Sequence, residues 1–186
     1  MNIIIVFLQM SKIKYLSNMK RILLSLFFIG TAFLSSFAQN KKAERDSLAV
    51  VKFEKALAAV EAKSFVIIVD YYRTEAGSTE VNTDAANFLS YEKEFVYLQG
   101  QLVAENSYRN KLTVDDNSKS VDKKGNVQIT LQVRGLLIIA KIEILLKKGG
   151  NYADVIITPT KGSVKRFSGE VVPPAESKYF KRAGEM

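Results

Sequence analysis

The densest group of oxygen-bearing side chains in the sequence has the composition of a calcium loop. An EF-hand loop places oxygen ligands at alternate positions around a central Gly, closes on a Glu and lies between helices. Here Lys119 occupies a ligand position, two more lysines follow, and strand-like segments flank the group. The sequence therefore predicts a solvated hairpin turn, and we expect no metal ion and no other cofactor. The group consists of Asp115, Asp116, Asn117, Ser118 and Asp122.

A single acidic residue in an apolar segment is the second candidate for chemistry. Asp70 lies in the segment Phe65–Tyr72, which is otherwise apolar or aromatic, and a carboxylate in such surroundings can have the raised pKa that acid–base catalysis uses. More often such a carboxylate lies at a strand end, in solvent or beside an Arg. No second carboxylate is tied to Asp70 by spacing, so we assign no catalytic residue. A carboxylate-dependent hydrolase is kept as the alternative function.

Composition argues against several classes of function. The chain has no Cys, which excludes disulfides and thiolate catalysis, and no His, the commonest general base and transition-metal ligand. Four of the 27 basic residues lie in residues 1–38, which contain no acidic residue; the other 23 accompany 19 acidic residues, a net charge of +4. That balance gives no case for a nucleic-acid partner. The basic group Lys178, Lys181 and Arg182 predicts a frayed, solvated tail.

The stretch Gly125–Val172 predicts the elements on which such residues would be placed. Its first segment alternates apolar and polar residues, with Val127, Ile129, Leu131 and Val133 on one side, as in a strand with one buried face. Apolar segments over 136–146, 152–160 and 164–172 follow, joined by short turns that contain Gly. This order predicts an antiparallel meander. Gly135 is expected at a turn or bulge with positive φ.

The remaining segments complete a mainly β (α+β) fold. Residues Ala43–Lys63 favour one N-terminal helix, with Leu48, Val51, Leu57 and Val60 on an apolar stripe. Further short strands upstream of the meander bring the total to about eight. Eight strands can curl into a small barrel or half-barrel. A two-sheet β-sandwich is the alternative architecture.

One apolar segment has more apolar surface than a single core requires. In an extended strand, Leu136 and Ile138 point one way while Leu137 and Ile139 point the other. A sheet curled around one core needs a single apolar face, so the second must be covered. The Ala43–Lys63 helix is one cover. The other is a partner or an apolar ligand, which makes Leu137 and Ile139 the candidate ligand-binding residues.

The first 38 residues have the pattern of a leader. Met19-Lys20-Arg21 precedes the apolar run Ile22–Leu34, and small residues Ser36 and Ala38 then occupy the positions that signal peptidase reads. The run is shorter than the roughly 20 residues that span a bilayer. We therefore expect a signal peptide over 19–38 that is cleaved after Ala38, and no stable membrane span afterwards. Residues 1–18 are interpreted as a gene-model extension, with a two-part membrane anchor as the alternative.

Several turn motifs resemble those of a known family. Asp122–Asn126 followed by an alternating strand, Gly149–Ala153, Phe167–Pro174 and Asn87–Leu89 are similar to the domain of unknown function 4251 family. The similarity spans roughly Leu48–Gly184. It implies a small exported protein of the Bacteroidota, in the periplasm or at the surface, without an assigned activity. Many members are lipoproteins, whereas this chain has no Cys to carry the lipid.

The sequence thus predicts one exported domain over residues 39–186, periplasmic or secreted. Its expected function is non-catalytic binding of a partner protein or an apolar small molecule in the Gram-negative envelope. Whether it has any enzymatic activity is left open. Neither the identity of the partner nor the oligomeric state follows from the residues.

The leader gives the first testable prediction. Because Ser36 and Ala38 supply the small residues that the peptidase reads, the exported protein should begin at Gln39. The intact mass of protein recovered from the envelope of its host should match residues 39–186. A mass that still includes Ile22–Leu34 would contradict cleavage.

Overall fold

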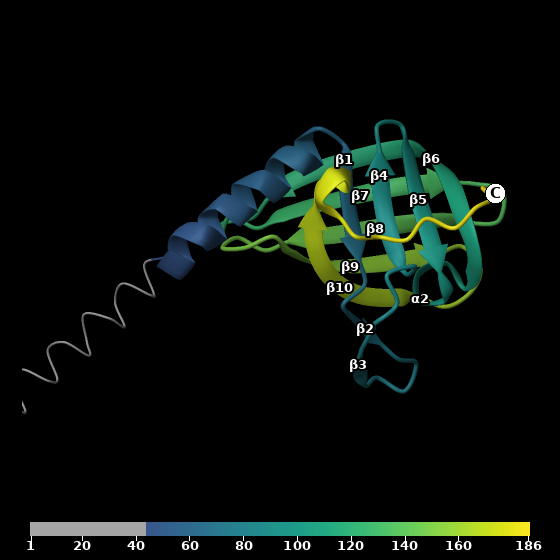
Figure 1. Cartoon of the computed structure of the whole chain (residues 1–186). Helices are drawn as coiled ribbons and strands as arrows, with labels where there is room; N and C mark the ends of the chain where they lie inside the picture. Colours follow the sequence, from purple (N-terminus) through teal and green to yellow (C-terminus); the bar gives the residue numbers. More distant parts are fainter. Residues whose placement is uncertain (1–43) are drawn as a thin grey trace, which may run out of the picture. The chain divides into compact units, whose positions relative to one another are not determined.

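The computed structural model describes residues 44–186, so the predicted leader and the start of the mature chain lie outside the described residues. The described part is mainly antiparallel β structure (Figure 1). It consists of a helix over residues 44–61, the strands β1 (Ser64–Ile68), β2 (Tyr71–Arg73), β3 (Thr79–Val81), β4 (Phe88–Glu92), β5 (Phe95–Gly100), β6 (Asn106–Val121), β7 (Val127–Arg134), β8 (Ile139–Leu146), β9 (Tyr152–Pro159) and β10 (Lys165–Val172), the short helix α2 (Gln101–Ala104) and the 3-10 helix η1 (Pro174–Glu176).

Eight of the strands form a closed antiparallel barrel. Their order is β1-β4-β5-β6-β7-β8-β9-β10, and β1 pairs with β10 to close the ring. The remaining strands, β2 and β3, continue from the edge of β10 as a small flap. The predicted barrel of about eight strands is therefore confirmed, and the two-sheet sandwich is wrong.

The interior of the barrel is filled by side chains. Along β7 buried and exposed residues alternate, so the inward face expected from the sequence is confirmed. The facing residues of β8 and β9 are buried in the same way. The interior of an eight-stranded barrel is just wide enough for its own side chains. Here these side chains form a single apolar core. Its largest fully buried apolar members are Phe65, Ile67, Leu89, Leu98, Leu112, Leu131, Ile142, Ile144, Leu146 and Ile157.

A glycine makes the closure of the barrel possible. β10 pairs with β1 through Val171 and Val172, and with β2 through Phe167 and Ser168. Gly169 lies between these two pairings, where the chain turns from β1 into β2. A Cβ atom at Gly169 would overlap the carbonyl oxygen of Ile68. No side chain fits there, so closure of the ring depends on this position being glycine.

Gly135 is also constrained by space, although the reason expected from the sequence is wrong. Its φ is not in the positive region. Residues 135–138 form the turn of the β7–β8 hairpin, which the Gly135 N–H closes by donating to the carbonyl of Ile138 at 2.7 Å. A Cβ at Gly135 would lie 2.7 Å from the carbonyl oxygen of Lys111. The apolar run from Leu136 is therefore a turn followed by β8, and not one strand.

The helix of residues 44–61 packs on one end of the barrel. Ala56, Ala59 and Val60 are buried in the barrel core, and Phe53 and Leu57 pack against it. Three ion pairs hold the helix to the rim: Lys52 with Glu170 at 3.3 Å, Lys55 with Glu176 at 2.7 Å, and Glu61 with Lys119. The predicted helix is confirmed over its described residues.

The first half of the predicted apolar stripe on that helix is wrong. Leu48 and Val51 are exposed, whereas Leu57 and Val60 pack on the barrel. Among the helices of residues 44–186, none has the length and apolar character needed to cross a membrane.

The C-terminal residues form an ordered strap across the outside of the barrel, so the predicted frayed tail is wrong. The Phe180 N–H donates to the carbonyl of Ala85 at 3.1 Å. The buried amide of Gln99 donates to the Phe180 carbonyl at 2.8 Å and accepts from the Arg182 N–H at 2.9 Å. The ring of Tyr179 packs edge-on against Phe88, with centroids 4.9 Å apart. The yellow end of the chain in Figure 1 follows this path over β4 and β5.

A carboxylate on β4 ties the strap to the barrel. The Glu92 carboxylate lies 3.0 Å from the Lys181 ammonium and 3.7 Å from the Arg109 guanidinium, and it accepts a 3.0 Å hydrogen bond from Ser90. Burial raises the pKa of Glu92, but the hydrogen bonds from Lys181 and Ser90 and the two cations outweigh it and leave the pKa lowered. Ionised Glu92 therefore stabilises the folded state.

The lowered pKa predicts how acid affects the strap. A carboxyl group with a lowered folded-state pKa contributes stability above its unfolded pKa, about 4.3 for Glu, and loses it as the pH falls through the folded-state value. Wild type should therefore have a higher urea midpoint than Glu92→Gln at neutral pH, and the difference should shrink by about pH 3. A difference that stays constant over this range would show that the ionised carboxylate contributes nothing.

The closure geometry predicts a large effect of one methyl group. Gly169→Ala should destabilise the fold by about 3 kcal/mol or more, because the Cβ meets a backbone carbonyl that cannot move without opening the β1–β10 pairing. The measurement is the free energy of unfolding in urea. Gly150→Ala is the matched control, since a Cβ at Gly150 meets no atom within 4 Å and its φ is not positive. Equal effects of the two substitutions would refute the closure argument.

Candidate functional site

The acidic group over residues 115–122 is divided between a strand and a turn: its residues 115–118 lie in β6, and Asp122 begins the β6–β7 turn. The Asp122 carboxylate accepts the N–H groups of Lys124 at 2.8 Å and Asn126 at 2.9 Å, and the Asn126 side chain at 2.8 Å. These hydrogen bonds, those of Asn126 first, lower the pKa of Asp122. Asp115 lies 2.7 Å from Arg134. The predicted hairpin turn is therefore wrong for residues 115–118, because β6 continues to Val121 and the turn to β7 covers residues 122–126. Within residues 44–186 no group of three acidic side chains is placed to hold a metal ion.

Asp70 lies at the bend between β1 and β2, beside an acidic residue that the sequence did not connect with it. Asp70, Glu170 and Tyr152 line one shallow cavity of about 320 Å³. The β1–β10 pairing brings Glu170 there, so only the topology could reveal this neighbour. Glu170 is ion-paired with Lys52 of the helix. Burial, with the Asp70 carboxylate nearby, raises the pKa of Tyr152 to about 12, so this phenol is protonated at neutral pH and cannot act as a base.

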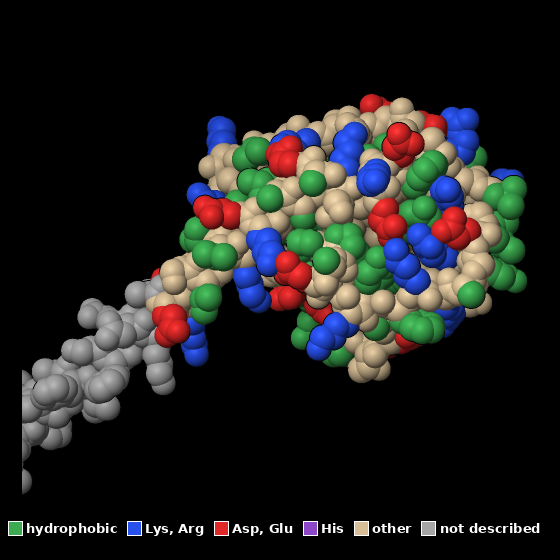
Figure 2. Space-filling view, turned by 45° about the horizontal axis from the view of Figure 1, so that its top comes forward, with side chains coloured by type: hydrophobic (Ala, Val, Ile, Leu, Met, Phe, Trp, Pro, Cys, Tyr) green, Lys and Arg blue, Asp and Glu red, His purple; other side chains and the backbone are tan. Residues whose placement is uncertain are grey.

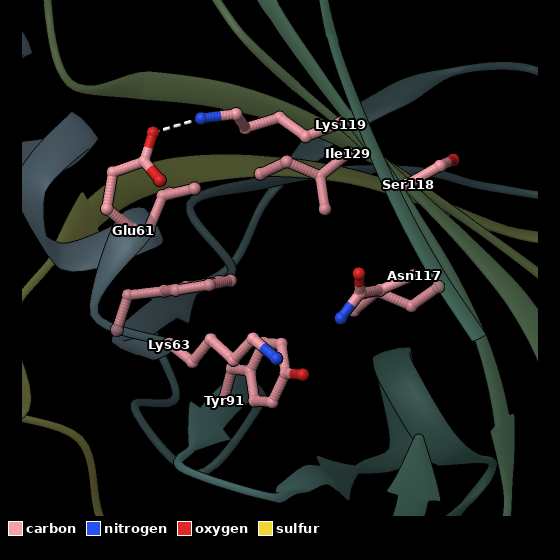
Figure 3. Close-up of a pocket in the computed structure, with 10 residues that line it drawn as sticks. Glu61, Lys63, Tyr91, Asn117, Ser118, Lys119 and Ile129 are labelled. Carbon is pink, nitrogen blue, oxygen red and sulfur yellow. Dashed lines mark hydrogen bonds and ion pairs between the residues drawn. The ribbon is translucent and has the colours of Figure 1, made fainter. Parts of the chain in front are cut away.

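A second cavity lies between the end of the helix and the barrel (Figure 3). Lys119 reaches across to Glu61, and the side chains of Tyr91 and Asn117 point into the opening, whereas Ser118 points away. The cavity has a volume of about 150 Å³. Pockets for small organic ligands measure roughly 300–1,000 Å³. This opening is therefore too small for such a ligand with the helix in place.

The other end of the barrel carries an open apolar groove. The tip of the β7–β8 hairpin places Leu136, Leu137 and Ile139 beside a cavity of about 390 Å³. Their exposed fractions are 79%, 56% and 49%. The opposite walls come from α2 and from the end of β9 and the β9–β10 turn. We call this the α2-end groove; its other apolar lining residues are Val103, Ala104, Ile138, Ile157 and Pro159.

The rim of the α2-end groove is polar and contains an ion pair. Glu105 lies 2.6 Å from the Lys165 ammonium and accepts a 2.5 Å hydrogen bond from the Ser163 hydroxyl. Hydrogen bonds from Lys165 and Ser163 lower the pKa of Glu105. These two charges satisfy one another, so Lys161 is the lining residue of the groove whose charge no ion pair among the described residues balances.

The structure places Leu137 and Ile139 differently from the sequence interpretation. They do not share one face of a long strand; Leu137 lies in the hairpin turn and Ile139 is the first residue of β8. The helix of residues 44–61 does not cover them. Leu136, the most exposed of the three, was not a predicted site residue. A leucine in a turn would have indicated an exposed apolar site residue. The turn was not recognised in the sequence, because residues 136–146 form one mainly apolar segment.

The motifs on which the family resemblance rests build the fold. Gly169 permits closure, and Asn126 accepts the Lys148 N–H at 3.0 Å, which links the β6–β7 and β8–β9 turns. The carbonyl of buried Asn151 accepts the Val171 N–H at 2.7 Å. The amide oxygen of buried Asn87 accepts the Leu102 N–H at 3.1 Å. None of these residues lines the α2-end groove.

Charges are mixed over the surface seen in Figure 2, where basic and acidic side chains are interspersed. This fits the twelve ion pairs found among the described residues. An electrostatic footprint for nucleic acid would require basic side chains gathered on a face or stripe, and this face has none.

The chain was compared with family models, curated proteins and solved structures. No family model and no curated protein matches the sequence. A solved structure of a DUF4251 family protein from Bacteroides eggerthii is similar, with 25% identity and a TM-score of 0.61 over 71% of this chain and 94% of that one. The fold and the turn motifs of this chain agree with the resemblance seen in the sequence, and this match supports membership of the domain of unknown function 4251 family.

Proposed function

We propose that the protein is an exported, non-catalytic binding module of the bacterial envelope that holds an apolar small molecule in the α2-end groove. The observation that carries the proposal is the exposure of Leu136, Leu137 and Ile139 beside a cavity of about 390 Å³. That volume falls in the range of small-molecule pockets.

The exposed apolar tip is not required by the hairpin itself. Turns of this kind are ordinarily built from Gly, Asn, Asp and Ser, which satisfy the backbone locally. Fully burying a Leu or Ile side chain contributes about 1.5–3 kcal/mol. Three such side chains at one tip therefore supply a driving force for association that the isolated domain leaves unused.

The packed interior directs binding to the outside of the barrel. Larger barrels enclose their ligands, whereas this interior is occupied by its own side chains. The cavity beneath the helix is smaller than an ordinary ligand pocket. The α2-end groove combines sufficient volume with apolar side chains beside a few polar ones, and ligand sites usually contain both kinds.

Export is supported by the leader pattern of residues 19–38 and by the family resemblance. We propose a periplasmic or secreted location after cleavage behind Ala38. The alternative function, a carboxylate-dependent hydrolase, has one observation in its favour, the shared cavity of Asp70 and Glu170. Against it, Lys52 neutralises Glu170, and the neighbouring phenol of Tyr152 cannot serve as a base at neutral pH.

A double substitution tests the groove. Leu137→Glu with Ile139→Glu should leave the urea midpoint nearly unchanged, since exposed substitutions usually change stability by less than about 0.5 kcal/mol. The same variant should lose the fluorescence enhancement of the neutral apolar dye N-phenylnaphthylamine, because two carboxylates then line the groove. Val121→Glu is the matched control, an equally exposed apolar residue near the β6–β7 turn at the other end of the barrel.

Three outcomes would overturn the proposal. If the double variant unfolds while Val121→Glu does not, the hairpin tip is part of the core. If all three proteins bind the dye equally, binding lies elsewhere. Loss of a co-purifying protein, with no loss of dye binding, would identify the tip as a protein-docking surface instead.

A further inference from the structure

Two arginines face each other on neighbouring strands at the edge of the barrel. The antiparallel register between β2 and β10 pairs Tyr71 with Ser168 and Tyr72 with Phe167. The next position of the same register places Arg73, the last residue of β2, opposite Arg166. Both residues are exposed and line the same two neighbouring cavities, of about 470 and 300 Å³.

Neither arginine has an acidic partner within residues 44–186. Arg109, Arg134 and Arg182 each form an ion pair, whereas Arg73 and Arg166 form none. Like charges directly opposite one another on adjacent strands destabilise a sheet. The chain therefore keeps two unpaired arginines side by side here, although it pairs Arg109, Arg134 and Arg182 with carboxylates.

The acidic groups around the pair are few and mostly engaged. Asp154 lies 2.6 Å from Lys147, and Glu80 accepts a 2.6 Å hydrogen bond from the Tyr72 hydroxyl. Glu75 is the one acidic residue that lines the larger cavity, against Arg73, Arg166 and Lys165. The Lys165 ammonium is paired with Glu105. The two guanidinium groups thus dominate the local charge.

We propose that Arg73 and Arg166 form a binding site for an anionic group, a carboxylate or a phosphate. A guanidinium presents its donors in a planar fork that matches both groups and binds them in a bidentate manner. An anion between two opposed guanidinium groups replaces their repulsion with two attractive contacts. The site lies between the turn of the β2–β3 flap and the β9–β10 turn, since residues of both line the larger cavity.

This site is separate from the α2-end groove and does not rest on the proposed function. The two share Lys165 and both use the β9–β10 turn, but the groove is completed by α2 and the β7–β8 hairpin, whereas the arginine site is completed by the β2–β3 flap. Arg73 and Arg166 are absent from the lining of the groove. Failure of one assignment therefore leaves the other standing.

The test uses the mature chain with inorganic phosphate and with acetate, each compared with sodium chloride at equal ionic strength. Phosphate or acetate should raise the thermal midpoint of wild type beyond the chloride reference. Arg166→Gln should bind the effective anion at least about 10-fold more weakly, a change of about 1.4 kcal/mol. In low salt the same substitution should leave the midpoint unchanged or raise it, because it relieves repulsion.

Arg134→Gln is the matched control, an exposed arginine whose carboxylate partner is Asp115. It should keep the full anion response and should not raise the low-salt midpoint. A response to phosphate alone assigns a phosphate group, and a response to acetate alone assigns a carboxylate. If Arg166→Gln keeps the anion response of wild type, or if neither anion acts beyond chloride, the site does not exist.

Discussion

The pairing of β10 with both β1 and β2 is the constraint on which the fold depends. It closes the barrel, it sets the flap of β2 and β3 on the outer edge, and it brings Glu170 to Asp70 and Arg166 to Arg73. Gly169 is the position at which the two pairings meet, and the backbone of Ile68 occupies the space of its missing side chain. Elements remote in sequence acquire their positions from this contact.

Local patterning predicted the strands and the hairpins of the meander, but only the β1–β10 pairing decides between a barrel and a sandwich. The period-two alternation of β7 identified its inward face, and short turns with Gly identified the hairpins. What escaped prediction was non-local or disguised. The residues that follow Gly135 in the Gly135–Ile138 turn are all apolar, so the sequence pattern predicted a strand there. The strap over Gln99 depends on hydrogen bonds between segments far apart in the chain, and so does the meeting of Arg73 and Arg166.

The division between scaffold and site explains why the family motifs reveal no activity. Asn87, Asn126, Asn151 and Gly169 satisfy turns and allow close backbone approach. The residues proposed to bind lie on the β7–β8 hairpin tip, where the scaffold places little constraint on side-chain chemistry. Members sharing the motifs can therefore share the barrel while differing in what the tip holds, because function resides in sites carried by a fold.

Native mass spectrometry of the protein purified from its own host tests the central claim most directly, that the α2-end groove holds an apolar small molecule. The account predicts a population heavier than the mature chain by the mass of one small organic compound, which extraction with organic solvent removes. A spectrum that contains only the mature chain, with gentle purification and intact folding, would contradict it.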